Sequence, residues 1–314
     1  MECIVAINVV VLVGGVGGAK LAFGLAQILP PENLTIIVNT GDDFWHYGLR
    51  VCPDLDTIMY TLSGLVSKTN GWGIEGDTHA VLDAARRYGE EPWFQLGDQD
   101  IATHLLRTNA MAAGETLTEV TRRLNTALGV QHCVLPMTDV PVATIVDTVE
   151  HGELAFQTYF VRYRWQPVVK SLRFAGIENA AITPAAHTAL QNADIIVIGP
   201  SNPWLSIAPI LAVPGMRDLI VSRDVPRVAI SPIIGGKAVK GPAAKLMVEL
   251  GYEQSAQIVA EYYGDVINGF IVDTIDKTLP LPVQHTTSFE IVMNSESDRI
   301  AVAENMLQWV QSWV

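Results

Sequence analysis

The chain has 314 residues, of which 49% are hydrophobic and 17% charged, a composition that is typical of a globular protein and excludes a disordered one. Its formal net charge of -13 disfavours general binding to nucleic acids or anionic membranes, because both need an excess of lysine and arginine. Three scattered cysteines, Cys3, Cys52 and Cys133, form no CxxC pair, so we expect reduced thiols in a cytoplasmic protein.

The first predicted element is a buried strand over residues 9–13, an uninterrupted apolar run that suits the centre of a parallel sheet. The glycine-rich segment "GGVGGAK" follows, and residues 19–29 then show the apolar spacing of a helix that ends at Pro30. A second buried strand over 34–40 completes a β–α–β unit. Such a unit opens a Rossmann-like, doubly wound α/β fold with a mainly parallel sheet.

The glycine segment after the first strand is predicted to bind a phosphate. Residues without a Cβ can adopt positive φ and let backbone N–H groups approach an anion, which the positive end of the following helix also attracts. The spacing matches neither the P-loop pattern nor the dinucleotide fingerprint, because Lys20 stands where the latter has its third glycine. Glycines that serve only close strand–helix packing are the alternative. The phosphate-binding candidates are Gly14, Gly15, Val16, Gly17, Gly18 and Lys20.

The second motif, "NTGDDFWHYGLRVCPDLDT" over residues 39–57, holds four aspartates at and beyond the end of the second strand. Clustered carboxylates beside a phosphate site suggest Mg²⁺, which is usually held by one or two carboxylates together with phosphate oxygens. The alternative is that an aspartate only caps the following helix or a turn. The acidic candidates are Asp42, Asp43, Asp54 and Asp56.

The middle of the chain is predicted to differ from the sheet region. Residues 79–128 show the pattern of three helices, the last of which begins with a capping box from Thr116 to Glu119. Residues 142–174 then alternate in the manner of strands around a turn. We therefore expect an insertion within the sheet domain. The expected division is a Rossmann-like nucleotide-binding core over 1–75 and 185–314, with a smaller helical and antiparallel β region inserted over 76–184.

The motif "FQLGDQDIATHLLRT" over residues 94–108 supplies a third group of polar candidates. Asp98 or Asp100 could serve only as a helix cap, and His104 could be only a helix-face histidine. The candidates from this segment are Leu96, Gly97, Asp98, Asp100 and His104.

Two later strands also end in loops of small and polar residues. These are "ADIIVIGPSNPW" over 193–204 and "PRVAISPIIGGKAVKG" over 226–241, whose lysines Lys237 and Lys240 can neutralise phosphate. An ordinary turn is the alternative for the first loop. Ligands of open α/β sheets lie beyond the carboxyl ends of the strands, so these loops should converge with the glycine segment on one crevice. The candidates here are Ser201, Asn202, Gly235, Gly236 and Lys237.

These segments, in this order over nearly the whole chain, resemble the 2-phospho-L-lactate transferase family, CofD and its bacterial counterpart FbiA. The tract "HYGLRVCPDLDTIMYTL" is similar to the bacterial branch, whereas Gln99 stands where we expect the family to favour arginine. The segments that carry the resemblance are "LVGGVGGAK", "VNTGDDFWHYGLRVCPDLDTIMYTLSG", "WFQLGDQDIATHLLRT", "FQTYFVRYRW", "GPSNP", "APILAVPGM" and "SPIIGGKAVKG".

The resemblance implies a reaction in the biosynthesis of coenzyme F-420. A phospholactyl or phosphoenolpyruvyl group would pass from a guanosine diphosphate-activated donor to the 5'-hydroxyl of the deazaflavin Fo, with release of GMP. Our hypothesis is that Asp42 and Asp56 hold Mg²⁺, that Asp43 assists, and that a carboxylate of this cluster accepts the hydroxyl proton. The glycine segment and the two later loops would hold the nucleotide half, residues 94–104 would contact the deazaflavin, and the family suggests a homodimer.

Two other classes of protein remain open at this stage. A non-catalytic, UDP-sugar-binding regulator of the YvcK-like gluconeogenesis factor type would share the fold and a related glycine loop. The full acidic tract together with "LGDQDIATH" favours the transferase. An NAD-dependent dehydrogenase is disfavoured by the incomplete fingerprint.

Overall fold

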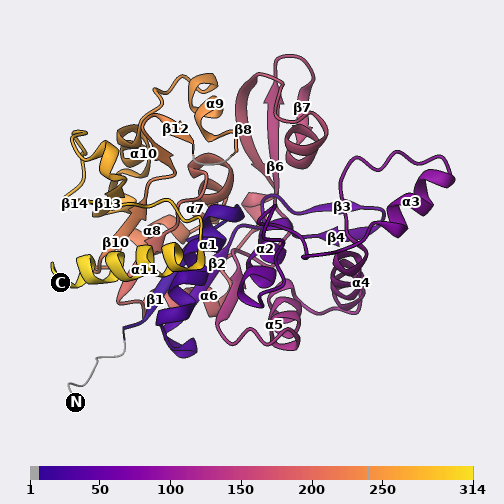
Figure 1. Cartoon of the computed structure of the whole chain (residues 1–314), viewed down its shortest axis with the longest axis horizontal. Helices are drawn as coiled ribbons and strands as arrows, with labels where there is room; N and C mark the ends of the chain where they lie inside the picture. Colours follow the sequence, from indigo (N-terminus) through magenta and orange to yellow (C-terminus); the bar gives the residue numbers. More distant parts are fainter. Residues whose placement is uncertain (1–6, 239–240, 314) are drawn as a thin grey trace.

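The computed structural model describes residues 7–238 and 241–313, so Cys3 and Lys240 lie outside the described residues. Its main element is a parallel sheet of seven strands in the order β14–β13–β10–β9–β1–β2–β5 (Figure 1). The predicted α/β fold with a parallel sheet is therefore confirmed. The strands are β1 (Val9–Val13), β2 (Leu34–Val38), β5 (Cys133–Pro136), β9 (Ile195–Ile198), β10 (Arg227–Ile230), β13 (Gly269–Val272) and β14 (His285–Ser288).

Helices cover both faces of this sheet because alternate residues of its buried strands point to opposite sides. On β1, Val9, Val11 and Val13 face one helix layer, whereas Val10 and Leu12 face the other. The first layer contains α1 (Gly15–Ile28), α2 (Pro53–Leu62) and α11 (Glu296–Gln311). The second contains α6 (Pro184–Gln191), α7 (Ala208–Ala212), α8 (Met216–Val221), α9 (Ala243–Glu249) and α10 (Ala256–Tyr263).

The direction in which the chain adds strands reverses between β1 and β9. After β1 the chain builds β2 and β5 on one side, and it then crosses over to build β9, β10, β13 and β14 on the other. Such a switch point leaves a crevice at the carboxyl ends of the two strands, because the connections that leave them run in opposite directions. The sheet thus places the loops after β1 and β9 side by side, as predicted.

The first helix begins earlier than the apolar pattern indicated. It starts at Gly15, so most of the predicted glycine loop forms the first turn of α1 and only Gly14 precedes it. The predicted helices of the middle region are present as α3 (Ala80–Arg87), α4 (Asp98–Ala112) and α5 (Leu117–Ala127), and the capping box of α5 is confirmed. A short hairpin of β3 (Phe44–His46) and β4 (Leu49–Val51) lies within the acidic motif.

The predicted strands of residues 142–174 form a separate antiparallel sheet of β7 (Gly152–Ala155), β6 (Ala143–Thr148) and β8 (Val169–Ala175). The alternation does not continue through "FQTYFVRYRW", where the chain forms a π-helix, η2 (Thr158–Arg162). The aromatic residues of this stretch favour a strand locally, but Phe156 and Tyr159 are buried in the core from a helical backbone. Tertiary packing therefore overrides the local preference here.

Part of the predicted insertion belongs to the main sheet, since β5 pairs with β2. The division into a core and an insertion remains a prediction. Among the described residues, the structure contains no helix with the length and apolar character that a membrane span requires.

Candidate active site at the carboxyl end of the sheet

A cavity of about 460 Å³ lies beyond the carboxyl ends of β1, β9 and β10. Its wall includes the start of α1, the acidic motif, the loop after β9 and the segment after β10, so segments that are far apart in the sequence meet there. The connection between β7 and β8 contributes Phe156, Gln157, Phe160 and Val161 to the wall. Figure 1 shows the small sheet that this connection belongs to at the top of the molecule. The structure thus confirms that the predicted loops converge.

The glycines after β1 serve two different purposes. A Cβ on Gly17 would lie 2.4 Å from the carbonyl oxygen of Pro200, and one on Gly18 would lie 2.6 Å from Oγ of Ser201. These two glycines are therefore required by close packing against the loop after β9, which was the alternative interpretation of the motif. Gly15 differs, because it has a φ of +63° and a Cβ there would meet nothing within 4 Å. Of the predicted set, Gly14, Gly15, Val16, Gly17 and Lys20 line the cavity and Gly18 does not.

Lys20 and the loop after β9 are held by specific hydrogen bonds. Nζ of Lys20 donates to the carbonyl oxygen of Met293 at 2.6 Å, and the backbone N–H of Gly14 donates to Oγ of Ser201 at 3.1 Å. Oδ1 of Asn202 accepts the backbone N–H groups of Trp204 and Leu205 at the start of η4 (Pro203–Ile207). Ser201 and Asn202 both line the cavity, as predicted.

The predicted residues Gly235, Gly236 and Lys237 lie away from the cavity wall. Both glycines have positive φ and form the turn between β11 (Ile233–Ile234) and β12 (Lys237–Ala238). This segment reaches the cavity through other residues, namely Ser231, Pro232, Gly241 and Pro242.

The four aspartates of the acidic motif are all buried, with exposed fractions between 4% and 7%. Asp42, Asp54 and Asp56 line the cavity, whereas Asp43 does not. The motif is anchored from two sides: Asn39 donates from Nδ2 to Oδ2 of Asp54 at 3.0 Å, and the backbone N–H of Thr144 on β6 donates to the carbonyl oxygen of Gly41 at 2.6 Å.

Burial raises the pKa of three of these carboxyl groups, because removal from water penalises the charged form. The pKa of Asp43 rises to about 7 through burial, although the charge of Arg50 opposes the rise. The pKa of Asp54 rises to about 6 through burial, against hydrogen bonds from Asn39 and the backbone of Gly15. The pKa of Asp42 rises well above its usual value through burial and then through the charges of Asp54 and Asp43. A cation at this end of the sheet would relieve that repulsion.

Asp56 belongs to a buried polar network that includes α4. Two nitrogens of Arg107 donate to the two carboxylate oxygens of Asp56, and His104 Nδ1 lies 3.6 Å from Oδ2 of that aspartate. Nε2 of His104 is 3.3 Å from Oδ1 of Asp100, to which the hydroxyl of Tyr60 donates at 2.6 Å. Ligand atoms of Asp56, Asp100 and His104 all lie within 4.8 Å of one another, a spacing that is compatible with a divalent metal.

Sequence reasoning missed Arg107, Tyr60 and the role of Asp54 in the cavity wall. A signal for Arg107 was available, because Asp100, His104 and Arg107 have the spacing of one helix face. Nothing in the sequence marked the apolar wall of the cavity as a unit. That wall includes Trp72, Phe94, Phe156, Phe160, Ile291 and Met293.

The predicted deazaflavin-binding segment divides at the start of α4. Asp100 and His104 line the cavity, but Leu96, Gly97 and Asp98 do not. Asp98 caps the neighbouring helix α3, since its carboxylate accepts the backbone N–H groups of Ala80 and Val81 at 2.9 Å. A role as a helix cap is the alternative interpretation of Asp98 given above. The helix that it caps is α3, whereas Asp98 itself is the first residue of α4.

Comparison with known proteins gives a consistent picture. Residues 9–310 match the family model described as "2-phospho-L-lactate transferase CofD". A 2-phospho-L-lactate transferase of Methanosarcina mazei is 39% identical over 303 residues, which cover 95% of this chain and 99% of that one. A phosphoenolpyruvate transferase of Streptomyces griseus is 43% identical over 274 residues, which cover 86% of each chain.

A solved structure shares the fold at low sequence identity. It is a member of the UPF0052 family from Bacillus halodurans, which superposes with a TM-score of 0.61 and 16% identity over 96% of this chain and 98% of that one. At this identity the likeness supports the architecture alone.

Proposed function

The chain belongs to the CofD family of 2-phospho-L-lactate transferases and is a transferase, and from this premise we propose that it moves a phospholactyl or phosphoenolpyruvyl group in the synthesis of coenzyme F-420. We propose that the reaction takes place in the cavity at the switch point between β1 and β9. Buried carboxylates, a positive-φ glycine and the first turn of α1 meet there. This combination suits a substrate that carries a diphosphate.

In this proposal the donor is a three-carbon acid linked to guanosine diphosphate, and the acceptor is the deazaflavin Fo. The ribityl 5'-hydroxyl oxygen of Fo attacks the phosphorus that bears the acid, the bond to the GMP oxygen breaks, and GMP leaves. The hydroxyl proton passes to a carboxylate in the cavity wall. Such a transfer depends mainly on positioning and on neutralisation of charge. The carboxylates that we propose for catalysis are Asp42 and Asp56, which line the cavity, and Asp43, which does not line it.

The residues of the cavity fit a divalent cation such as Mg²⁺. Oδ1 of Asp42 is buried and has no hydrogen-bond partner among the described residues, although Asp42 lines the cavity. Carboxylate oxygens are the ligands that Mg²⁺ prefers, and the ion would polarise the diphosphate and stabilise the leaving GMP. We propose Asp42 as a ligand, and Asp56 as a second ligand remains the prediction from sequence.

The two substrates would occupy different parts of the wall. Gly14–Gly17, Lys20, Ser201 and Asn202 surround the start of α1 and suit the phosphates of the nucleotide. The aromatic side chains Trp72, Phe94 and Phe160, together with Asp100 and His104, suit a flat ring system that also offers polar edges. Gly18, Gly235, Gly236 and Lys237 stay predictions as nucleotide contacts, as do Leu96, Gly97 and Asp98 as deazaflavin contacts.

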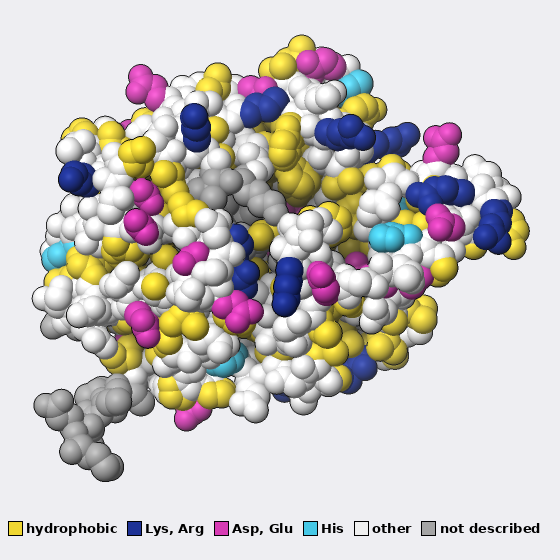
Figure 2. Space-filling model, in the orientation of Figure 1, with side chains coloured by type: hydrophobic (Ala, Val, Ile, Leu, Met, Phe, Trp, Pro, Cys, Tyr) yellow, Lys and Arg dark blue, Asp and Glu magenta, His cyan; other side chains and the backbone are white. Residues whose placement is uncertain are grey.

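The surface charge is compatible with anionic substrates despite the net charge of -13. Figure 2 shows lysine and arginine side chains over the small sheet and over α3 on this face. Arg162, the last residue of η2, directly follows Val161 of the cavity wall, and both it and the nearby Arg164 are exposed. Basic groups at a rim raise the local concentration of an anionic substrate.

The test is a direct incubation. The protein, Mg²⁺ and Fo are mixed separately with lactyl-2-diphospho-5'-guanosine and with its enolpyruvyl analogue, and products are followed by chromatography with mass spectrometry. A Fo-derived product and GMP, both lost in EDTA, are the expected result, and the donor that reacts identifies the three-carbon acid.

The same preparation tests the regulator alternative. If neither donor gives product and UDP-N-acetylglucosamine raises the melting temperature while guanine nucleotides do not, the transferase proposal is wrong for this chain. Size-exclusion chromatography with light scattering tests the proposed homodimer.

A further inference from the structure

The stretch of chain between α2 and α4, residues 63–97, supplies one side of the cavity wall, and we call it the arm. The arm carries α3 and extends away from the main sheet in Figure 1. It reaches the cavity twice, with Trp72 and Gly73 before α3 and with Phe94 and Gln95 after it. Neither contact comes from a helix or a strand, so other interactions must hold these residues in place.

Two aspartates at the base of the arm each cap the helix that the other one precedes or begins. Asp77 lies just before α3, and its carboxylate accepts the backbone N–H groups of Gln99 at 3.0 Å and Asp100 at 3.1 Å in the first turn of α4. Asp98 begins α4, and its carboxylate accepts the first two backbone N–H groups of α3 at 2.9 Å. The backbone N–H of Asp98 also donates to the carbonyl oxygen of Thr78 at 2.8 Å. We call the pair Asp77 and Asp98 the clasp.

The clasp explains why residue 97 is a glycine. A Cβ on Gly97 would overlap Oδ2 of Asp77, the oxygen that accepts the backbone N–H of Asp100. The φ of Gly97 is -75°, which any residue can adopt, so the close approach of the carboxylate is what excludes a side chain there. Gly97 and Asp98, which the sequence marked as candidate site residues, therefore both serve the base of the arm.

The clasp lies close to each group that this side of the wall brings to the cavity. Trp72 precedes Asp77 by five residues, and Phe94 precedes Asp98 by four. The backbone N–H of Asp100 is held by Asp77, while the side chain of Asp100 lines the cavity. Release of the clasp would thus affect both contacts of the arm and the first turn of α4 together.

The two contacts of the arm have different additional support. Phe94 packs edge-on against Phe44 of β3 with ring centroids 4.8 Å apart, so the hairpin of β3 and β4 also holds it. Trp72 lies on a loop that is closed by a hydrogen bond from the backbone N–H of Ser67 to the carbonyl oxygen of Gly73 at 2.9 Å. Trp72 is 45% exposed and is flanked by glycines with positive φ, and glycine loses the most conformational freedom on ordering. Trp72 therefore depends more on the clasp than Phe94 does.

We propose that Asp77 is a positioning residue of this transferase, which acts through the clasp to hold Trp72 and Asp100 where the flat ring of the acceptor binds. The proposal rests on the proposed function and deepens it. Asp77 itself does not line the cavity, so its loss would change binding only through the residues that it holds. The segments that we propose for the phosphates, at the start of α1 and after β9, lie outside the arm. Binding of the donor should therefore be independent of the clasp.

The test compares the KM for Fo with the KM for the guanosine diphosphate-linked donor. Asp77→Ala removes the cap of α4 and should raise the KM for Fo about tenfold or more, because small displacements of positioning groups are costly, while the KM for the donor changes by less than about threefold. Asp77→Asn keeps one acceptor oxygen and should fall between Asp77→Ala and the parent chain. The matched control is Asp83→Asn, which removes an exposed carboxylate from α3 and should leave both KM values unchanged.

A second measurement follows the clasp without catalysis. Amide hydrogen exchange of Asp77→Ala should become faster over residues 64–76 and 88–96 and should stay parent-like in α5. Gly97→Ala displaces the carboxylate of Asp77 and should show the same local change. Asp83→Asn should exchange like the parent chain throughout.

Three results would overturn the inference: a parent-like KM for Fo in Asp77→Ala, equal rises in the KM for Fo and for the donor, or faster exchange over the whole chain. The last result would mean that Asp77 supports the fold in general. Failure of the proposed function gives a different result, since the parent chain would then neither bind Fo nor form product, while Asp77→Ala would still change hydrogen exchange locally in the arm.

Discussion

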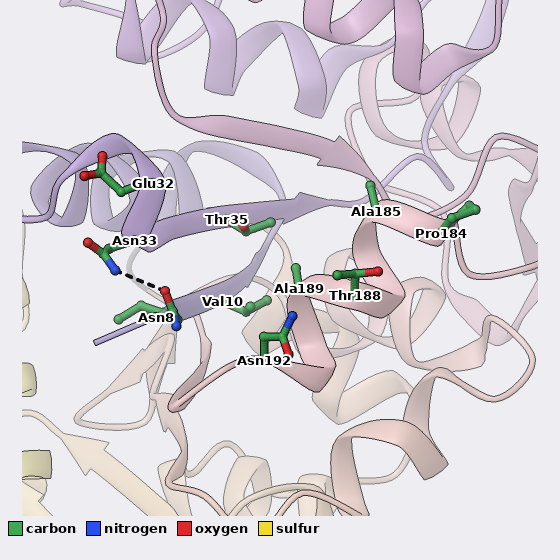
Figure 3. Close-up of a pocket in the computed structure, with 11 residues that line it drawn as sticks. Asn8, Val10, Glu32, Asn33, Thr35, Pro184, Ala185, Thr188, Ala189 and Asn192 are labelled. Carbon is green, nitrogen blue, oxygen red and sulfur yellow. Dashed lines mark hydrogen bonds between the residues drawn. The ribbon is translucent and has the colours of Figure 1, made fainter. Parts of the chain in front are cut away.

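Two hollows lie at opposite ends of the main sheet, and in the described part of the chain only the one at the carboxyl ends is lined by buried carboxylates. The hollow at the amino ends of β1 and β2 measures about 810 Å³, against about 460 Å³ for the cavity at the carboxyl ends. Figure 3 shows its wall, where Nδ2 of Asn33 donates to Oδ1 of Asn8 at 3.0 Å. Among the described residues of that wall, no buried polar side-chain atom lacks a partner.

The cavity at the carboxyl ends has the opposite character. It contains buried carboxylates with raised pKa values and a buried oxygen without a partner. It is also bordered by both π-helices, η2 and η4, and π-helical turns are frequent at functional sites. Unsatisfied polar groups and unusual backbone thus mark the carboxyl-end cavity as the site, since both cost stability and need a reason to persist.

The largest expected effect is on turnover. Asp42→Asn should lower kcat by about 100-fold or more. The cavity would lose a carboxylate that we propose as a ligand of the cation, and this cation would stabilise the negative charge that develops on the leaving GMP. Initial rates of GMP release with saturating donor and Fo measure this effect. Thr188→Ala in the amino-end hollow is the matched control and should leave kcat unchanged. Parent-like kcat in Asp42→Asn would remove its catalytic assignment.

The next effect is on stability, and it tests the buried ion pair between Asp56 and Arg107. Arg107→Met leaves Asp56 buried without its partner and should lower the free energy of unfolding by about 3–5 kcal/mol. Arg173→Met breaks an exposed ion pair with Glu153 and should cost far less, because water and salt screen exposed charges. Urea unfolding compares the two. Equal losses of unfolding free energy in both variants would show that burial of the Arg107–Asp56 ion pair does not determine its contribution to stability.

A smaller loss of stability should distinguish the two kinds of glycine after β1. Gly17→Ala places a Cβ against the carbonyl group of Pro200 and should cost about 1–3 kcal/mol. Gly15→Ala meets open space and should cost about 1 kcal/mol through its positive φ alone. If Gly15→Ala is the more destabilising of the two, the packing explanation of Gly17 is wrong.

The smallest effect is expected in the amino-end hollow itself. Asn192→Ala should change the free energy of unfolding by less than about 0.5 kcal/mol, because Asn192 is an exposed residue at the edge of this hollow and surface substitutions of this kind usually have small effects. Turnover should be unchanged. A loss of activity in this variant would break the contrast between the two ends of the sheet.

Much of the fold follows from local patterns. Residues 9–13 were predicted as a central strand because an unbroken apolar run can be buried on both faces, and β1 has these bounds. The strand β14 was missed because "HTTS" is polar and lies at the sheet edge, where it needs no apolar pattern. The π-helix η2 was missed because its aromatic residues favour strands, and only their packing into the core selects a helix.

Residue types and short spacings are enough to predict a β–α–β unit with a glycine segment, followed by four clustered aspartates. Which of these aspartates forms an ion pair with an arginine depends on how distant segments pack. Arg107 lies 51 residues from Asp56 and reaches it because α4 packs beside the acidic motif. The charge state and role of a buried carboxylate depend on the groups within a few ångströms of it, and spacing along the chain does not specify those neighbours.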